Sequence, residues 1–382
     1  MSLYKYRLLA PGPTPVPEKV LTHMAEPIIH HRTAAFEAIV AEVKEGLKWL
    51  YQTTEEVLIF AASGTGAMEG AVINVMSKGD KALVVDSGKF GERWWKIAKA
   101  YGLSFEVIQV EWGKAVDPKI IAEKLAKEDY RTVMITASET STGVAHPVKE
   151  IAEIVKKYDS TVLIVDAITG LGVFDLPCDK WGLDIVVSGS QKALMLPPGL
   201  AFASISAKAW KLIDKSDIPK FYFDFKKEKK AILENTTAYT PAVSLVIGLN
   251  DVLKSMKAMG LEGVFKKHQL LGSACREGLK AMGLKLFAPE HPSNAVTAVY
   301  SPEGIDAGKI VKGLRDGFNM TIAGGQDAAK GKIFRIGHLG YYDPMDMVSV
   351  LAAIEITLHK NGYKLELGKG VGAALKVIAE CK

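Results

Sequence analysis

Cysteine is scarce in this sequence: only Cys178, Cys275 and Cys381 occur among its 382 residues. They are widely separated and form no CxxC pair, so the sequence offers neither a disulfide framework nor the ligand spacing of a structural zinc site. This usage is typical of a reduced, cytoplasmic protein, and we expect no metal ion.

An excess of charge of one sign is also missing. The 48 basic and 43 acidic residues leave a net charge of +5, which is small for a chain of this length. The densest basic stretch, Lys226–Lys230, is short and typical of a solvated helix face or turn. The sequence therefore predicts no nucleic-acid partner.

Uninterrupted apolar runs are absent as well. The apolar part of the first 17 residues is too short and too rich in proline for a signal peptide. The longest candidate span, Val57–Met76, is interrupted by Ser63–Gly66 and carries Glu69 and Asn74. A buried strand, a glycine-rich turn and a buried helix explain it better than a membrane span, so we expect a soluble protein with no membrane partner.

What the sequence does contain is enough apolar material for a large core. Hydrophobic residues make up 48% and charged residues 24%, which excludes disordered and collagen-like chains and suggests two or three domain-sized units. Seven short apolar runs read as strands covered on both faces: Val57–Phe60, Ala82–Val85, Phe105–Val110, Thr132–Thr136, Val162–Val165, Ile185–Val187 and Ala201–Ile205. Helical patterns such as Pro118–Lys127, with Asp117 as its cap, and Pro147–Tyr158 lie between them, which predicts a three-layer α/β domain with a mainly parallel sheet.

The pattern changes near residue 250. Two long helices are predicted over Ala242–Met259 and Gly263–Met282. The later segments, fewer and more mixed, are Ala295–Tyr300, Ala307–Arg315, Lys332–Gly337 and Pro344–Lys360. We therefore expect an N-terminal extension (1–15), a large domain (16–258) and a smaller C-terminal α+β domain (259–382), with the boundary in or beside a connecting helix.

Three features carry candidate chemistry. Lys192 follows a strand in a loop of small residues, Asp166 ends a buried strand, and Ser63–Gly66 joins a strand to a helix. Taken singly, they could be a surface lysine, a helix cap and a common glycine-rich turn. Together, a lysine that forms an imine with an aldehyde, a carboxylate that keeps a pyridine nitrogen protonated and a helix N-terminus that binds a phosphate indicate pyridoxal 5′-phosphate.

Motifs along nearly the whole chain then make a family resemblance specific. The sequence resembles the class V, fold-type I aminotransferases, in particular the alanine–glyoxylate and serine–pyruvate group. The matching stretches are Pro11–Thr14, Ala62–Gly70, Asp86–Arg93, Ser138–Val144, Val165–Gly172, Ser188–Gly199 and Phe334–Gly340, and about the last twenty residues match no motif. The resemblance implies the three-layer fold of that family and a homodimer with shared active sites.

It also implies a role for each matching residue. Lys192 would be the Schiff-base lysine and the base for the proton shift, with Asp166 on the pyridine nitrogen. Arg335 would hold the substrate carboxylate. The remaining cofactor contacts would come from Ser63, Gly64, Thr65 and Gln191 (phosphate), Thr240 or Tyr239 of the other subunit (phosphate), Thr140 (ring hydroxyl) and Phe90 (ring stacking, where close mammalian relatives have Trp).

The implied activity is a ping-pong transfer from alanine or serine to glyoxylate or pyruvate. One alternative is a transaminase for phosphoserine or aspartate, because His31 and Arg32 resemble the His-Arg pair of phosphoserine aminotransferases. A cysteine desulfurase fits less well, since Cys178 is expected in a loop and Cys275 in a helix, neither placed as a mobile thiol, and Phe90 replaces a stacking histidine.

Another alternative is a non-catalytic nucleotide-binding protein that uses Ser63–Gly66 as a Rossmann-like turn. The sequence has no GxGxxG motif to support it, and it would leave Lys192 unexplained. The other histidines that we considered, His23, His146, His268 and His338, are expected to be surface or capping residues.

Overall fold

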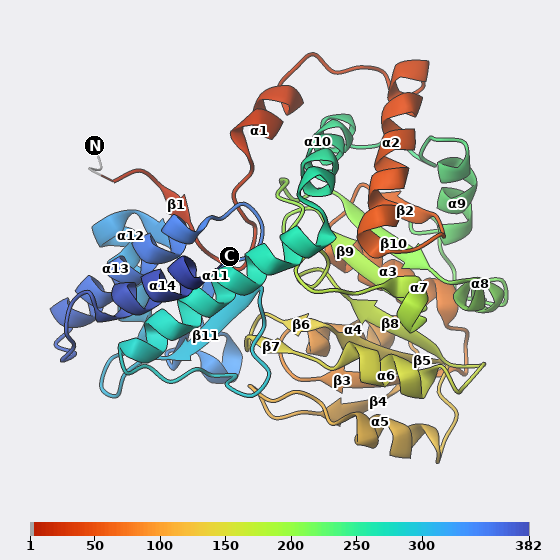
Figure 1. The fold of residues 1–382 in the computed structure, drawn as a ribbon. Coiled ribbons are helices and arrows are strands. Elements are labelled where there is room, and N and C mark those ends of the chain that lie inside the picture. The colour runs from red at the N-terminus through yellow and green to blue at the C-terminus, as the bar shows by residue number, and fades with distance from the viewer. Residues whose placement is uncertain (1–3, 382) are drawn as a thin grey trace.

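A seven-stranded mixed sheet forms the centre of the larger part of the molecule in the computed structural model, which describes residues 4–381 (Figure 1). Across the sheet the strands are β2 (Val57–Phe60), β10 (Ala201–Ile205), β9 (Ile185–Gly189), β8 (Val162–Asp166), β5 (Thr132–Thr136), β3 (Lys81–Asp86) and β4 (Ser104–Gln109). Strand β10 runs antiparallel to β2 and β9, and all other neighbouring pairs are parallel. The predicted α/β class with a mainly parallel sheet is confirmed.

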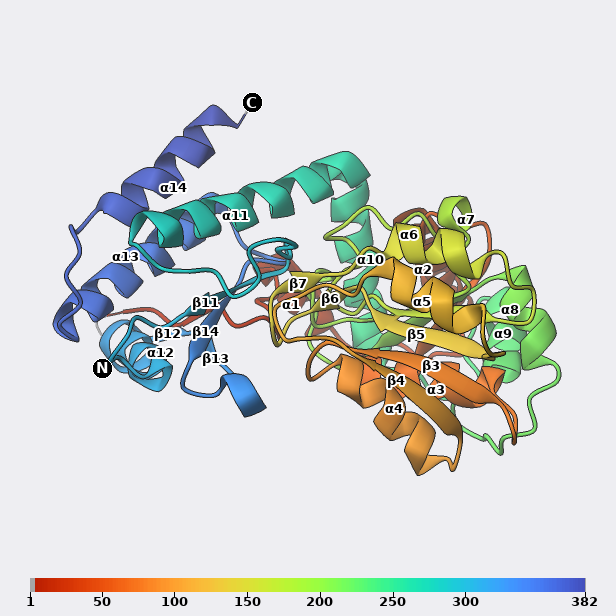
Figure 2. The same cartoon turned by 90° about the horizontal axis from the view of Figure 1, so that it is seen from below.

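Helices cover both faces of this sheet, which is why its central strands are apolar throughout. Figure 2 shows α4 (Gly91–Ala100) on one side of strands β3 to β5, and α5 (Pro118–Leu125) and α6 (Val148–Val155) on the other. The Asp117 side chain accepts from the Lys119 N–H and caps α5, as predicted.

Among residues 4–381 no helix combines the length and apolar character that a membrane crossing requires.

The chain reverses its direction of travel across the sheet between β3 and β5. It adds β4 beyond β3, then returns past β3 to build β5, β8 and β9 in turn. In sheets of this kind ligands bind at the carboxyl ends of the strands beside such a reversal. Asp86, Thr136, Asp166 and Gly189 are the last residues of four of these strands.

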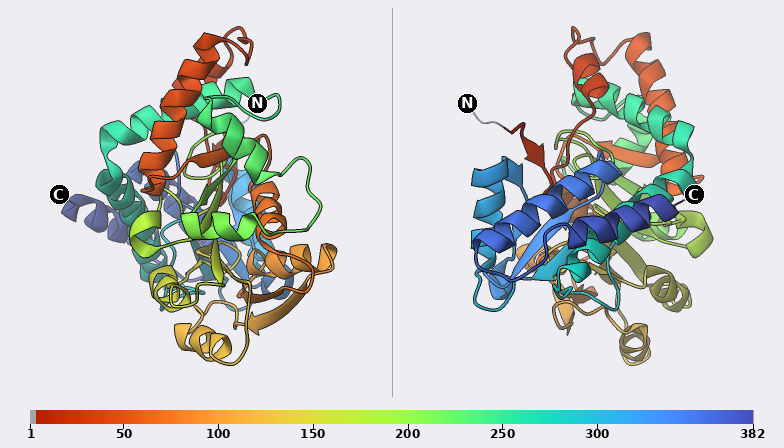
Figure 3. Two further views of the ribbon diagram at one scale, coloured as in Figure 1. Left: turned by 90° about the vertical axis from the view of Figure 1, so that its right-hand side faces the viewer. Right: turned by 60° about the vertical axis from the view of Figure 1, so that its left-hand side comes forward.

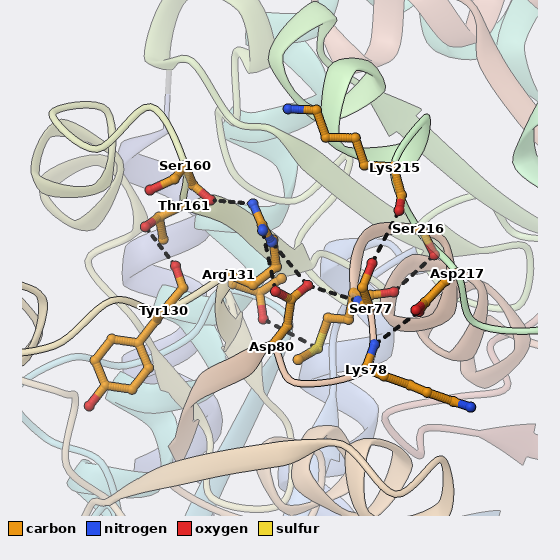
Figure 4. A network of polar contacts seen from close by, with 12 residues as sticks. Ser77, Lys78, Asp80, Tyr130, Arg131, Ser160, Thr161, Lys215, Ser216 and Asp217 are labelled. Atoms are coloured by element: carbon orange, nitrogen blue, oxygen red, sulfur yellow. Dashed lines mark hydrogen bonds and ion pairs between the residues drawn. The ribbon is translucent and has the colours of Figure 1, made fainter.

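The opposite, amino-terminal edge of the sheet is held by a separate polar network (Figure 4). Arg131 donates from Nε and Nη2 to the two carboxylate oxygens of Asp80, at 3.0 and 3.2 Å, and from Nη1 to the Ser160 carbonyl. Asp80 also accepts from the Ser77 N–H at 2.8 Å. Such a two-pronged pair fixes the turns that precede β3 and β5.

The C-terminal part has its own small sheet and helices. Strands β11 (Val296–Tyr300), β14 (Ile333–Gly337) and β13 (Ala323–Gly324) pair in that order. The helices are α11 (Leu261–Ala281), α12 (Ala307–Phe318), α13 (Pro344–Lys360) and α14 (Lys369–Glu380), of which α13 and α14 lie beside each other at the right of Figure 3. Near the N-terminus, β1 (Arg7–Leu8) pairs with β12 (Met320–Thr321) of this part.

Two apolar cores meet at the junction of α10 (Val243–Met259) and α11. One core belongs to the large sheet, and the other joins Leu9 to α11, α13 and the small sheet. Gly260, between the two helices, has a φ of +76°, a conformation that favours glycine. We propose the domain boundary here, in line with the predicted division, with residues 7–9 of the extension packed on the smaller domain.

The last helix lies in the segment that the family motifs do not reach. Its N-terminus is capped from within the core by the buried Glu355 carboxylate, which accepts from Gly368 N–H at 2.7 Å and Gly370 N–H at 2.6 Å. A carboxylate is favourable at the positive end of a helix, so Glu355 fixes α14 against α11 and α13.

Three of the four histidine predictions are wrong. His146, His268 and His338 are buried, because both ring nitrogens of each have hydrogen-bond partners that replace water. Burial lowers the pKa of all three, to about 4 for His146 and about 3 for His268. His23 lies at the surface beside Asp251, as expected.

The prediction that Cys178 lies in a loop is also wrong, because Cys178 is the first residue of the short helix α7 (Cys178–Trp181).

The pKa of His146 predicts acid-sensitive stability. Its folded-state pKa lies below the unfolded value of about 6.5, so its contribution is complete above that pH and is lost as the pH falls toward 4. Between pH 7.5 and pH 5 we expect His146→Gln to lose about 2 kcal/mol less unfolding free energy than the wild type. Denaturant titrations at the two pH values measure this, and an equal loss in both proteins would contradict it.

Candidate active site

The carboxyl edge of the sheet brings together the three features that the sequence singled out. Asp166 is the last residue of β8, and Lys192 follows β9 by three residues. Ser63 precedes α3 (Gly64–Val75), and Gly189 packs so closely on this helix that an added Cβ would lie 3.4 Å from Gly64 N. Asp166 and Lys192 also influence each other's pKa, so their charged groups share one site.

The Lys192 side chain occupies the space beside Gly12, where a larger residue than glycine would clash with it. Its Nζ donates to the Pro11 carbonyl at 2.8 Å, and a Cβ on Gly12 would lie only 2.1 Å from Nζ. Burial lowers the pKa of Lys192 to about 8; Asp166 opposes this shift, and the cations Arg335 and Arg93 add to it. The amine therefore exchanges a proton close to neutral pH, which suits a nucleophile or base.

Asp166 is almost completely buried at the end of its strand. The Ile168 N–H donates to its Oδ1 at 2.8 Å. Burial raises the pKa of Asp166 to about 7 and Glu139 adds to the shift, while the Ile168 hydrogen bond, Arg93 and Lys192 act against it. A carboxyl group in this state would be stabilised as an anion by a cation placed against it.

The N-terminus of α3 has donor groups of the kind that bind an anion. Ser63 is its N-cap residue, yet the Ser63 side chain makes no capping hydrogen bond. Nearby, Gln191 has a buried Oε1 without a hydrogen-bond partner. Thr65 Oγ1 accepts from Arg93 at 3.0 Å. Free helix amides, an uncommitted hydroxyl and an amide group are the donors that a phosphate requires.

Arg335 comes from β14 of the smaller part and is also buried. It donates from Nε to the Gly324 carbonyl at 2.9 Å and from Nη1 to the Thr140 carbonyl at 2.8 Å. In the described part of the chain no carboxylate lies within 4.0 Å of its guanidinium, and burial lowers its pKa to about 10. A buried cation without a counter-charge is costly, so this group is suited to a carboxylate ligand.

Two further residues of the site were given no role from the sequence. The Glu139 carboxylate is fully buried and accepts from Phe90 N–H (3.0 Å), Gly91 N–H (2.9 Å) and Ser141. It thereby fixes the start of α4, where Phe90 stands. The Arg93 guanidinium lies 4.9 Å from the centre of the Phe90 ring. An acidic residue among small polar ones after a buried strand was the signal for Glu139.

The remaining predicted residues belong to two other loops of the chain. His31 and Arg32 belong to the connection between α1 (Glu18–Met24) and α2 (Ala34–Tyr51), which arches away from the sheet at the top of Figure 1. Within the described residues their contacts are to His30: its ring lies 4.7 Å from that of His31, and its Nδ1 accepts from Arg32 N–H. The structure does not bring this pair to the lysine.

Tyr239 and Thr240 lie in the loop before α10. Tyr239 donates to the Phe221 carbonyl at 2.7 Å and stacks on Tyr222 with ring centres 5.1 Å apart. Thr240 is exposed.

Among residues 4–381 no group of three or more His, Cys, Asp or Glu side chains is arranged to hold a metal ion.

Known proteins are similar to this chain over nearly its full length. A family model described as "Aminotransferase class-V" matches residues 7–350. The chain is 44% identical over 380 residues to a soluble hydrogenase 42 kDa subunit of Anabaena cylindrica, covering 98% of this chain and 99% of that protein. It is 36% identical over 377 residues to an L-aspartate–glyoxylate aminotransferase of Paracoccus denitrificans, covering 96% and 94%.

A solved structure agrees with these sequence relatives. The crystal structure of ureidoglycine–glyoxylate aminotransferase from Bacillus subtilis superposes with a TM-score of 0.94 at 30% identity, covering 100% of each chain. The resemblance inferred from the motifs is thereby confirmed, as is the fold that it implied. The chain belongs to the class V aminotransferases and is a transaminase.

Proposed function

We propose that this transaminase uses pyridoxal 5′-phosphate to move an amino group from a small amino acid, alanine or serine, to glyoxylate or pyruvate. The observation that carries the proposal is the buried pair of Lys192 and Asp166, whose pKa values are both shifted toward neutrality at one sheet edge. Glyoxylate as acceptor is supported by the names of the Paracoccus and Bacillus relatives.

The residues present fit this cofactor. The NH₂ group of the Gln191 side chain, the free Ser63 hydroxyl and the first amides of α3 would hold the phosphate, and Phe90 would stack on the ring. Thr140, whose carbonyl accepts from Arg335, would contact the ring hydroxyl. Bound there, pyridoxal phosphate supplies an electron sink for the substrate's α-carbon.

The protein's own groups would then position the reactants and move protons. Asp166, as a buried carboxylate, would hold a proton on the pyridine nitrogen of the bound cofactor. Lys192 Nζ, with a pKa of about 8, would take the proton from the substrate's α-carbon and return it during transfer. Arg335 is buried, and its Nε already donates to the Gly324 carbonyl. Its two Nη groups would therefore bind the substrate carboxylate through two parallel hydrogen bonds.

We further propose a cytoplasmic homodimer in which Thr240 or Tyr239 reaches the phosphate of the partner subunit. Thr240 is exposed beside a surface that carries Phe221, 73% exposed, and Tyr222. Another exposed apolar residue, Ile28, precedes His31 and Arg32. Large apolar groups of this kind on a surface are typical of interfaces, which would give both loops a place at a shared site.

Aspartate is a second candidate donor, supported by the name of the Paracoccus relative. The Arg32 side chain would then hold the distal carboxylate, or the phosphate of phosphoserine, across the dimer. A desulfurase is less well supported, because Cys178 and Cys275 are both buried and burial raises the pKa of each thiol.

A donor-by-acceptor activity matrix tests these choices. Purified enzyme is assayed with alanine, serine, aspartate and phosphoserine against glyoxylate and pyruvate, in the wild type and in Arg32→Ala. We expect alanine or serine with glyoxylate to give the highest kcat/KM, and no selective loss in the variant. A loss of about 10-fold or more confined to aspartate or phosphoserine would overturn the preferred donors.

Replacing Arg335 by Lys should raise KM for every donor and acceptor by about 10-fold or more, because a point charge does not reproduce a two-pronged bond. Steady-state kinetics measure this. Arg315→Lys is the matched control, since Arg315 is exposed on α12 and pairs with Asp316. Unchanged KM values in Arg335→Lys would remove this residue from substrate binding.

A further inference from the structure

A cavity of about 200 Å³ is lined by residues of α10 and α11 and of the loops beside them. Figure 2 shows the junction of these two helices. The wall of the cavity is formed mainly by apolar side chains, with Met195, Met256 and Val264 among them. Met259 and Tyr341, which are 52% and 42% exposed, also line it and give it access to solvent. Lys192, Asp166 and Arg335 do not line this cavity.

Lys267 is the one cation of the cavity wall. Its Nζ donates to the Gly340 carbonyl at 2.9 Å, and in residues 4–381 no carboxylate oxygen lies within 4.0 Å of it. The Asp343 and Asp346 charges act on it only from a distance, and burial lowers its pKa. An ammonium has three N–H donors, so donors remain for a ligand. The adjacent Lys266 differs, because it is exposed and pairs with Glu262 at 2.8 Å.

We propose that this cavity binds a small carboxylic acid with an apolar tail or ring. Its carboxylate would pair with Lys267, and its apolar part would lie against the methionines, whose flexible side chains adapt to different shapes. The volume is below the roughly 300–1,000 Å³ of pockets for drug-sized ligands, which limits the ligand to a small molecule.

The wall of the cavity touches the backbone of the active-site lysine. Gly340 accepts from Lys267, and its N–H donates to His268 Nε2 at 3.0 Å. A Cβ on Gly340 would lie 2.9 Å from the Lys192 carbonyl oxygen, and that oxygen also accepts from the N–H of the cavity residue Met195 at 3.0 Å. A ligand that draws Lys267 away from Gly340 therefore acts on the loop that carries Lys192.

The cavity is thus a regulatory site whose ligand changes the transamination rate. The change in rate rests on the proposed function, but the binding of the ligand does not depend on it. Calorimetric titration of the cofactor-loaded enzyme with hexanoate tests binding, with hexanamide and acetate as matched ligands. We expect Lys267→Met to weaken hexanoate binding at least 10-fold and Lys266→Met to change it less than twofold. Hexanamide and acetate should both bind at least 10-fold more weakly than hexanoate.

Because Arg335 also binds carboxylates, Arg335→Lys separates the two sites. Hexanoate binding that survives in Arg335→Lys and is lost in Met259→Trp, which blocks the entrance, supports the cavity. The proposal is overturned if the wild type does not bind hexanoate, if Arg335→Lys loses hexanoate binding, or if Lys267→Met binds hexanoate as well as the wild type does. Hexanoate should change the wild-type transamination rate at least twofold and leave that of Lys267→Met unchanged; a complex without any rate change overturns the regulatory role. An enzyme without transaminase activity would refute the proposed function and leave the calorimetric result standing.

Discussion

Lys192→Ala should abolish transamination while pyridoxal phosphate still binds non-covalently. The substitution removes the amine that bonds to the cofactor and the group that moves the α-proton, and the proton transfer alone accounts for roughly 10²–10⁴ in rate. Enough of the site remains for binding, because the α3 N-terminus, Gln191 and Phe90 are untouched. Steady-state assays with cofactor in excess, together with cofactor titration, measure both effects.

A lysine at the opposite edge of the sheet provides the control. Lys215 is exposed, and only its backbone takes part in the network of Figure 4. Lys215→Ala should keep full activity. Residual activity in Lys192→Ala within 10-fold of the wild type would show that Lys192 is not the reactive amine.

Asp166→Asn should reduce kcat by at least 10²-fold and change cofactor affinity much less. The neutral amide cannot hold a proton on the pyridine nitrogen, so the loss falls on the transition state, where electrostatic groups of this kind contribute most. Near-wild-type kcat in Asp166→Asn would place the carboxylate outside the reaction.

Stability provides a second readout for the same variant. Asp166 has a folded-state pKa of about 7, above its unfolded value of about 3.9, so without cofactor its charged form destabilises the fold as the pH rises from about 4 to 7. The cofactor-free Asp166→Asn protein should therefore be more stable than the wild type at pH 8. Asp80→Asn, in the Asp80–Arg131 pair of Figure 4, should instead lower stability and keep kcat.

The sequence predicted the central sheet closely because its strands are buried on both faces. Each of the seven apolar runs matches a strand to within two residues. The position of β10 between β2 and β9 was beyond prediction, because strand pairing joins residues far apart in the chain and leaves no local pattern. The pairing of β1 with β12 was missed for the same reason.

The sequence predicted those residues of the candidate site whose chemical type and position at a strand end are both visible in it. Lys192 and Asp166 stand at strand ends, and parallel strands bring such ends together. The role of Glu139 was harder to predict, since it depends on the start of α4, 48 residues earlier in the chain. The buried His146, His268 and His338 were misjudged because the partners of their ring nitrogens come mostly from distant segments.

Borohydride reduction of the cofactor-loaded enzyme, followed by peptide mass mapping, tests the central claim most directly. Reduction makes the bond between an amine and pyridoxal phosphate permanent, so the labelled peptide identifies the lysine that carries the cofactor. We predict a single label, on Lys192, and none in Lys192→Ala. A label on any other lysine, or wild-type enzyme that takes up no label, would contradict the account.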